Sequence, residues 1–141
     1  MKIEDYAAVY ELWLSCKGMG LNDVDDSQEG IARFLERNPD TCFVCEEDGK
    51  LIGVIMAGND GRRGYIYHTA VAPAYQKRGI GSALVKTVLK AFKGLGISKA
   101  ALVVFARNEE GNAFWEKQGF TARTDITYRN KALVEMIRKD T

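Results

Sequence analysis

The sequence predicts an α/β fold in which a sheet of about six strands is flanked by helices on both faces. Apolar residues recur at helical spacing in two segments near the start of the chain, and three strand-like runs joined by short turns follow them. A strongly amphipathic helix then follows the third run directly. The complete order of elements is ααβββαβαββ. With 141 residues, the chain is expected to form a single domain over residues 1–141.

Two helices are predicted before any sheet. The first covers residues 4–16, where one apolar stripe is formed by Tyr6, Val9, Tyr10, Trp13 and Leu14. Only residues 1–3 precede it, so a first strand must be very short or missing. Residues 17–26 have no periodicity and are predicted to be a loop. The second helix begins after a cap at Asp26 or Ser27 and ends at Asn38-Pro39.

Three strands and the remaining elements follow in order. Residues 41–47 and 50–57 are joined by Asp48-Gly49, which is typical of a two-residue hairpin turn. A second turn leads to a third strand over residues 64–71, and residues 81–92 form the amphipathic helix. A strand over residues 100–105, a short helix capped by Asn108 and ended by Gly119, and two final strands over residues 120–128 and 133–137 complete the prediction.

Charge and cysteine content narrow the function classes. The chain has 20 basic and 19 acidic residues, so no broad positive field would attract nucleic acid or a membrane, and neither partner is expected. Three cysteines, with no apolar signal segment at the start, indicate a reduced, cytoplasmic setting. Cys42 and Cys45 have the spacing of a redox or metal pair, but alternation along a strand points them to opposite faces. We therefore interpret both as packed thiols and expect no metal.

The turn before the amphipathic helix is the most informative segment. Gly79 and Gly81 remove side chains where the backbone must approach a ligand, and the free N–H groups at the start of a helix favour an anion. Lys77 and Arg78 add positive charge at the same place. The turn therefore suits a pyrophosphate.

This turn, Gln76-Lys-Arg-Gly79-Ile-Gly81, resembles the acetyl-coenzyme A signature of the GNAT N-acetyltransferases. A second family pattern, an Asn followed by a short helix and an aromatic residue four positions before Gly-Phe, resembles the segment from Asn108 to Gly119-Phe120. The resemblance covers nearly the whole chain. It implies a GNAT-type mixed, mostly antiparallel sheet. It also implies an enzyme that transfers the acetyl group of acetyl-CoA to a primary amine of a small molecule, peptide or protein, by direct attack in a ternary complex.

The resemblance further implies where acetyl-CoA binds. The pyrophosphate would lie on the amides of residues 77–82, the pantetheine arm between the strands that end at Val71 and Phe105, and the thioester carbonyl near the Val71 amide. The implied cofactor-binding residues are Ala70, Val71, Ala72, Gln76, Lys77, Arg78, Gly79, Ile80, Gly81, Ser82, Asn108, Asn112 and Trp115. Trp115 stands where the family often has a Tyr that protonates the leaving thiolate, and an indole N–H cannot supply that proton.

His68 and Val71 are the candidate catalytic residues. An acceptor amine with a pKa of about 10.4 must lose a proton before it attacks, and an imidazole titrates close to neutral pH. His68, the only histidine, lies on the strand that leads to Val71, although a packed or solvent-facing histidine with a water molecule as base is an open alternative. The Val71 amide would stabilise the oxyanion without any side chain.

The sequence says least about the residues that bind the acceptor amine. The resemblance implies that the loop of residues 17–26, Tyr65 or Tyr67, and the turn of residues 129–131 line it. The acceptor can be cationic, since Asp23, Asp25 and Asp26 could attract an amine, although these carboxylates could equally serve as caps or solvated charges. The identity of the amine is open, and a homodimer is one assembly that the sequence allows.

Two other function classes stay open on the residues alone. Trp115 and the lack of an unambiguous base would suit a non-catalytic module that binds acyl-coenzyme A. The glycine turn would also suit a nucleotide- or phosphate-binding protein. A nicotinamide dinucleotide fits less well, because Ala83 or Leu84 stands where a third glycine would be and no acidic residue ends the strand over residues 100–105.

Overall fold

A computed structural model describes all 141 residues and contains six strands and four α-helices. The strands are β1 Gly20–Asn22, β2 Phe43–Glu47, β3 Lys50–Asn59, β4 Gly64–Val71, β5 Ala100–Ala101 and β6 Arg138–Asp140. The helices are α1 Tyr6–Ser15, α2 Gln28–Arg37, α3 Ile80–Gly94 and α4 Glu109–Lys117, with short 3-10 turns at Ile3–Asp5 and Pro73–Tyr75. None of these helices has the length and apolar character that crossing a membrane requires.

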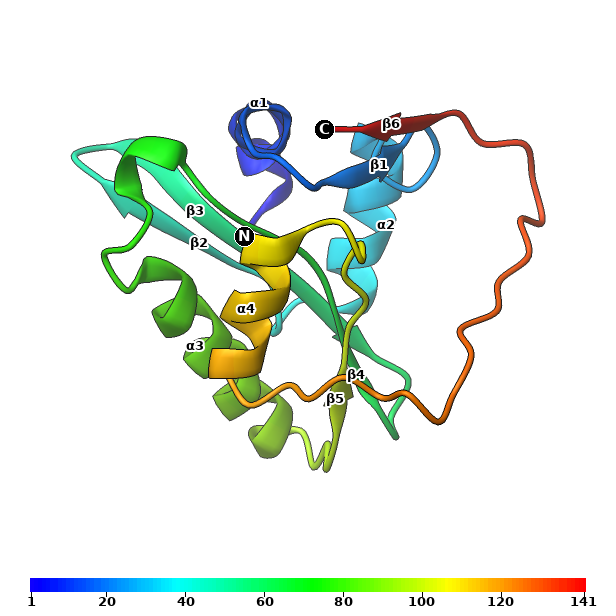
Figure 1. Cartoon of the computed structure of the whole chain (residues 1–141). Helices are drawn as coiled ribbons and strands as arrows, with labels where there is room; N and C mark the ends of the chain where they lie inside the picture. Colours follow the sequence, from blue (N-terminus) through cyan, green and yellow to red (C-terminus); the bar gives the residue numbers. More distant parts are fainter.

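A four-stranded sheet in the order β2-β3-β4-β5 forms the centre of the molecule (Figure 1). Its strands pair antiparallel except β4 and β5, which pair parallel. Helices α1 and α2 cover one face, and α3 and α4 cover the other. The predicted class, a mixed and mostly antiparallel sheet with helices on both faces, is therefore confirmed.

The two apolar clusters meet on β3, which is buried on both sides. Val54 and Met56 face the cluster of α1 and α2, whereas Ile55 and Ala57 face the cluster of α3 and α4. This strict alternation follows from the period of two along a strand. Cys42 and Cys45 are free thiols that belong to opposite clusters, as predicted.

Local turn chemistry agrees with the sequence. Asp48 and Gly49 have φ angles of 51° and 75°, both in the left-handed region that a two-residue hairpin turn requires. Ser27, not Asp26, caps α2, because its side chain accepts a hydrogen bond from the Gly30 N–H. In α1 the buried side chains are Val9, Leu12 and Trp13, whereas Leu14, predicted to be in the stripe, is exposed.

Several predicted elements differ from the structure: one predicted loop contains a strand, two predicted strands do not form, and one predicted strand is shorter. Residues 17–26 contain β1, which pairs antiparallel with β6, more than a hundred residues away in the chain. The strands predicted over residues 120–128 and 133–137 do not form, and the strand predicted over residues 100–105 shortens to β5. Apolar alternation identifies the face of a strand, but a strand also needs a neighbour with free N–H and C=O groups.

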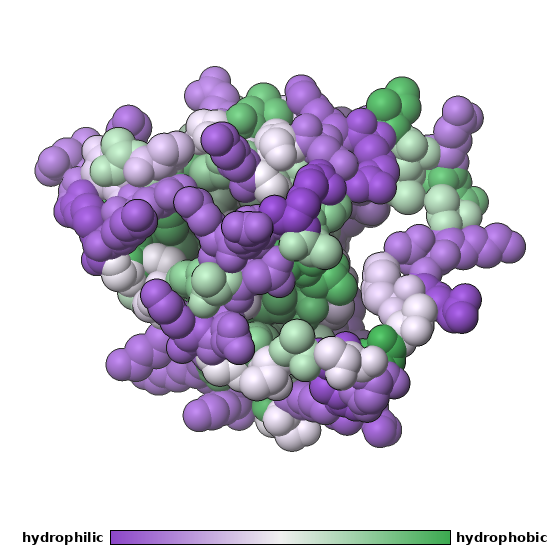
Figure 2. All heavy atoms as spheres, viewed as in Figure 1, coloured by the Kyte–Doolittle hydropathy of each residue, from purple (hydrophilic) through white to green (hydrophobic).

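The segment between α4 and β6 swings away from the body before it returns to β1 (Figure 1). In the space-filling view an opening separates it from the rest of the molecule (Figure 2). Its apolar side chains are largely exposed, including Ile126, Leu133 and Ile137. The segment therefore adds little to either apolar cluster.

An extra residue in β4 sets the direction of the functional side chains. Ile55 pairs with Thr69 and Ala57 pairs with Ile66, so Met56 alone lies opposite both Tyr67 and His68. Such a bulge breaks the alternation of the strand that carries it. Tyr67 packs on Phe34 of α2 and His68 packs on Trp13 of α1, so these two neighbours face the same side of the sheet.

The first prediction concerns Gly64, which lies directly against α3. A Cβ atom at this position would lie 2.6 Å from the Phe92 ring, so Gly64→Ala should lower the free energy of unfolding by about 1–3 kcal/mol through overpacking. Gly94→Ala is the matched control, because a Cβ atom there meets nothing within 4 Å and alanine favours a helix. Urea unfolding of both variants measures the difference. Equal stabilities would contradict this packing.

Candidate active site

The turn that precedes α3 presents backbone N–H groups to solvent. Lys77 and Gly79 have φ angles of 61° and 82°, so the chain makes two left-handed steps before the helix. Gly79 occupies the N-cap position and has no side chain that could accept from the first N–H groups of α3. These donors and the positive end of the helix dipole are therefore available to an anion.

The two cations of this turn have different surroundings. The Arg78 guanidinium donates to both carboxylate oxygens of Glu47, at 2.8 and 3.4 Å, and lies 5.3 Å from the centre of the Tyr75 ring. This hydrogen-bonded pair lowers the pKa of Glu47 and raises that of Arg78. Lys77 makes no ion pair within the chain. Of the two predicted phosphate-binding side chains, Lys77 is thus the free one.

The N–H and C=O groups of Val71 point toward the side of β4 on which β5 lies. The Ala72 N–H donates to the Ile52 carbonyl at 2.8 Å, so in the antiparallel pattern the N–H and C=O of Val71 point away from β3. The Val71 carbonyl accepts from Gln76 Nε2 at 3.0 Å and from the Cys16 thiol at 3.4 Å.

The space beside Val71 is left open by β5. Strand β5 pairs with β4 only at Gly64 and Tyr65, at the opposite end of the strand. The two chains part beyond these residues, so the Val71 N–H faces a gap rather than a paired strand. Thr69, two residues before Val71, has a buried side-chain hydroxyl with no hydrogen-bond partner. Two polar groups on β4 are thus left without partners in the chain.

His68 and Asp26 form a largely buried pair on the face of β4 that α1 and α2 cover. The Asp26 carboxylate is only 5% exposed, and its Oδ1 lies 2.6 Å from His68 Nε2. Its other oxygen accepts from the Asn22 N–H at 2.7 Å. Because an ionised carboxylate only accepts, this contact assigns the donor role to Nε2, and in the neutral imidazole the lone pair is then on Nδ1. The Trp13 ring packs edge-on against the imidazole, with the ring centres 4.8 Å apart.

The predicted residues of α4 have structural contacts. Asn108 Oδ1 accepts from the Gly111 N–H and caps the helix, as predicted. Asn112 Nδ2 donates to the carbonyls of Phe105 and Asn108. Trp115 is buried in the cluster beneath α3, where it packs against two phenylalanines.

The other predicted cofactor residues lie in the last part of β4, in the turn after it, or in the first turn of α3. Ala70 is buried under α1 and α2, and Ser82 Oγ accepts from Gln118 Nε2. A Cβ atom at Gly53 would lie 3.1 Å from Ile80, so the Ile80 side chain covers β3. A Cβ atom at Gly81 would lie 3.2 Å from the Phe114 ring, which shows how closely α3 and α4 approach each other there.

The sequence did not indicate three groups near this site. The pairing of Asp26 with His68, the Cys16 thiol at the Val71 carbonyl, and Thr141 all depend on partners at least 42 residues away. The Thr141 hydroxyl donates to the Cys16 carbonyl at 2.5 Å and accepts from the Met19 N–H at 3.0 Å. No local pattern carries such information, although the acidic run before α2 was a partial signal.

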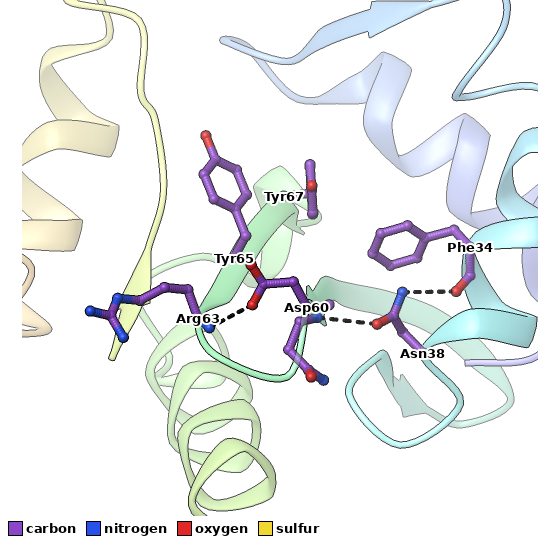
Figure 3. Close-up of a pocket in the computed structure, with 8 residues that line it drawn as sticks. Phe34, Asn38, Asp60, Arg63, Tyr65 and Tyr67 are labelled. Atoms are coloured by element: carbon purple, nitrogen blue, oxygen red, sulfur yellow. Dashed lines mark hydrogen bonds between the residues drawn. The ribbon is translucent and has the colours of Figure 1, made fainter. Parts of the chain in front are cut away.

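A cavity of about 330 Å³ lies at the start of β4, away from Val71. It is lined by Phe34, Asn38, Gly58, Asn59, Asp60, Arg63, Tyr65 and Tyr67 (Figure 3). Tyr67 lies between the rings of Phe34 and Tyr65, with ring centres 5.3 and 4.7 Å apart. Burial, followed by the nearby Tyr128 phenol, raises the pKa values of Tyr65 and Tyr67.

Known proteins resemble this chain in sequence and in fold. Residues 6–120 match the model of the Acetyltransferase (GNAT) family. An acetyltransferase of Sodalis glossinidius (strain morsitans) is 33% identical over 132 residues, which cover 94% of this chain and 92% of the relative. Ard1 from Thermoplasma volcanium has a TM-score of 0.76 and 22% identity, over 86% of this chain and 79% of that one. The PaiA N-acetyltransferase from Thermoplasma acidophilum, in complex with coenzyme A, has a TM-score of 0.73 and 20% identity, over 87% of each chain.

The second prediction concerns the stability that Asp26 provides. Asp26→Ala removes the acceptor of two hydrogen bonds, and each hydrogen bond to a charged group contributes about 1.5–3 kcal/mol. The variant should therefore lose about 3 kcal/mol of unfolding free energy in urea titrations. Its neighbour Asp25 is exposed, so Asp25→Ala should change stability by about 0.5 kcal/mol or less. A loss below 1 kcal/mol for Asp26→Ala would contradict the buried pair.

Proposed function

We propose a donor and an acceptor for this chain, which belongs to the Acetyltransferase (GNAT) family and is an acyltransferase. The donor is acetyl-CoA, and the acceptor is a primary amine that attacks the thioester directly in a ternary complex. The observation that carries this proposal is the arrangement of β4. Its Val71 N–H faces the gap beside β5, and His68, three residues earlier, has a buried carboxylate partner on the other face.

The residues around the gap fit coenzyme A. The uncapped start of α3 and the Lys77 ammonium suit a pyrophosphate, and the N–H of Val71 suits the carbonyl oxygen of a thioester. A solved structure with the same fold contains coenzyme A, which supports this assignment. Arg78 would contribute through its backbone N–H, because its guanidinium is bound to Glu47.

The chemistry follows from the positions of His68 and Val71. Nδ1 of His68 would accept a proton from the acceptor amine, and Asp26 would stabilise the resulting imidazolium. The amine nitrogen then forms a bond to the carbonyl carbon, and the Val71 N–H donates to the oxygen as negative charge develops there. When the C–S bond breaks, the electron pair leaves with sulfur as a thiolate. The second proton of the attacking nitrogen passes through water to this thiolate, so that the products are the amide and free thiol. A thiol pKa of about 8.5 makes this departure feasible without a general acid, so Trp115 need not supply a proton.

The third prediction tests the base with two variants. His68→Gln should lower kcat/KM by about 10²-fold or more, since a positioned base contributes about 10²- to 10⁴-fold. Asp26→Asn should have a similar effect while it keeps the shape of the site. Asparagine has one oxygen for two donors, so its NH2 group can turn to His68 and move the imidazole proton to Nδ1.

Rates are measured as free thiol released from acetyl-CoA across a range of amine acceptors and pH values. Asp25→Asn is the control, because that exposed carboxylate does not contact His68. Near-normal rates with an unshifted acidic limb in both His68→Gln and Asp26→Asn would assign the proton transfer to water.

The fourth prediction tests the cofactor half of the site. Lys77→Asn removes the free ammonium but tolerates the left-handed backbone at this position. Loss of a charge-assisted hydrogen bond should weaken coenzyme A binding about tenfold in calorimetry, and the loss should shrink as salt is added. Lys86→Gln makes the same charge change on the exposed side of α3 and should leave the dissociation constant within about twofold. Equal affinities for the two variants would refute the pyrophosphate position.

A further inference from the structure

The cavity beside Tyr67 points to the class of acceptor. We propose that it binds a second, positively charged group of the substrate, so that the preferred acceptor is a small diamine or polyamine. This inference rests on the amine acetyltransferase activity proposed above. The reacting amine would lie at His68, and the distal ammonium would lie against the aromatic wall formed by Phe34, Tyr67 and Tyr65.

The aromatic wall suits an ammonium group. Phe34, Tyr67 and Tyr65 form a continuous row, and Tyr67 is 50% exposed (Figure 3). Aromatic faces attract cations held within about 6 Å of the ring centre. Neither Tyr65 nor Tyr67 donates its hydroxyl hydrogen to a group of the chain, and their raised pKa values keep the phenols neutral. Both hydroxyl oxygens are thus free to accept from an ammonium.

One carboxylate, that of Asp60, belongs to the lining of the cavity beside this wall. The backbone N–H groups of Arg63 and Arg62 bind Oδ1 of Asp60 and hold the pKa of that carboxyl below its ordinary value. Oδ2 of Asp60 has no partner in the chain and is free to meet a cation. A distal ammonium would therefore find a negative group beside the aromatic wall.

Arg63 is the one cationic side chain in the lining, and it is directed elsewhere. Its guanidinium donates to the Arg62 carbonyl at 3.2 Å, and it points away from Phe34 (Figure 3). The cavity therefore presents Asp60 and the aromatic wall to its occupant rather than a guanidinium. An anionic distal group, such as the carboxylate of an amino acid, would lie against the Asp60 carboxylate.

The bulge in β4 connects the cavity with the base. Because Tyr67 and His68 face the same side, the wall of the cavity continues to the imidazole. Between one and three residue steps separate Tyr67 and Tyr65 from His68, which is about 3–10 Å of strand at about 3.3 Å per residue. A chain of several methylene groups between two amines bridges a separation of this order. The charge on the distal amine would persist while His68 removes a proton from the reacting one.

The experiment compares three acceptors of matched length. These are 1,4-diaminobutane, n-butylamine and 4-aminobutanoate, which differ only in a cationic, apolar or anionic distal end. With saturating acetyl-CoA and thiol release as readout, kcat/KM should be at least about tenfold higher for the diamine than for n-butylamine. The lowest value should belong to 4-aminobutanoate, because its carboxylate meets Asp60.

A variant of Asp60 separates recognition of the distal charge from general damage. Asp60→Asn keeps an oxygen for the N–H groups of Arg62 and Arg63 but removes the charge. The ratio of kcat/KM for 1,4-diaminobutane to that for n-butylamine should fall about tenfold. Asp48→Asn is the control, because it makes the same change in the exposed β2–β3 turn and should leave the ratio unaltered.

Two outcomes would overturn the inference. One is a diamine-to-monoamine ratio within about twofold of unity, or one that Asp60→Asn does not change. The other is a preference for 4-aminobutanoate that Arg63→Gln abolishes, which would assign the cavity to a carboxylate. Acetylation of any of the three amines would still uphold the proposed function. If none is acetylated, the diamine inference fails, and acetylation of a peptide N-terminus would show that the amine acetyltransferase function survives without it.

Discussion

The bulge in β4 is the constraint on which the candidate site depends. In a regular strand, Tyr67 and His68 would face opposite sides of the sheet, and the imidazole would lie on the α3 face. The extra residue opposite Met56 brings both side chains to the α1 and α2 face and restores the normal alternation before Val71. The strand pairs with β5 only ahead of this bulge. The bulge thus occurs together with the two features that the proposed acyl transfer needs. These are the gap between β4 and β5 and a histidine on the face that α1 and α2 cover.

The two sides of β4 consequently have different electrostatic character. On one side, the uncapped start of α3 and the Lys77 ammonium form a cationic region beside the gap. On the other, Asp26 contacts His68 and Asp60 lines the cavity beside the aromatic wall. A protein with a net charge of only +1 thus separates its charges across a single strand, which would direct an anionic donor and a cationic acceptor to opposite sides of that strand.

Much of this arrangement could be predicted from the sequence, and the remainder depends on long-range contacts. Asp48-Gly49, the Asn108 cap and the glycine turn are local features, because a few neighbouring residues determine their backbone angles. The orientation of His68 could not be predicted, since it depends on a bulge and on a carboxylate 42 residues away. The predicted strands over residues 120–137 failed for a related reason. Their alternation is strand-like, but no sheet edge in the structure pairs with them.

The pairing of β1 with β6 has a consequence for the order in which the site is assembled and lost. The β2–β3–β4 meander needs only short loops, whereas Gly20 must find Asp140 across most of the chain. The entropy of closing so large a loop is lost before any contact compensates it, so this pairing should form after the central sheet during folding. It should also be among the first contacts to open in native fluctuations. Thr141 is hydrogen-bonded to Cys16 and Met19, and the Cys16 thiol contacts the Val71 carbonyl. Amide hydrogen exchange in β1 and β6 would therefore report whether the region around Val71 is intact while the core stays folded.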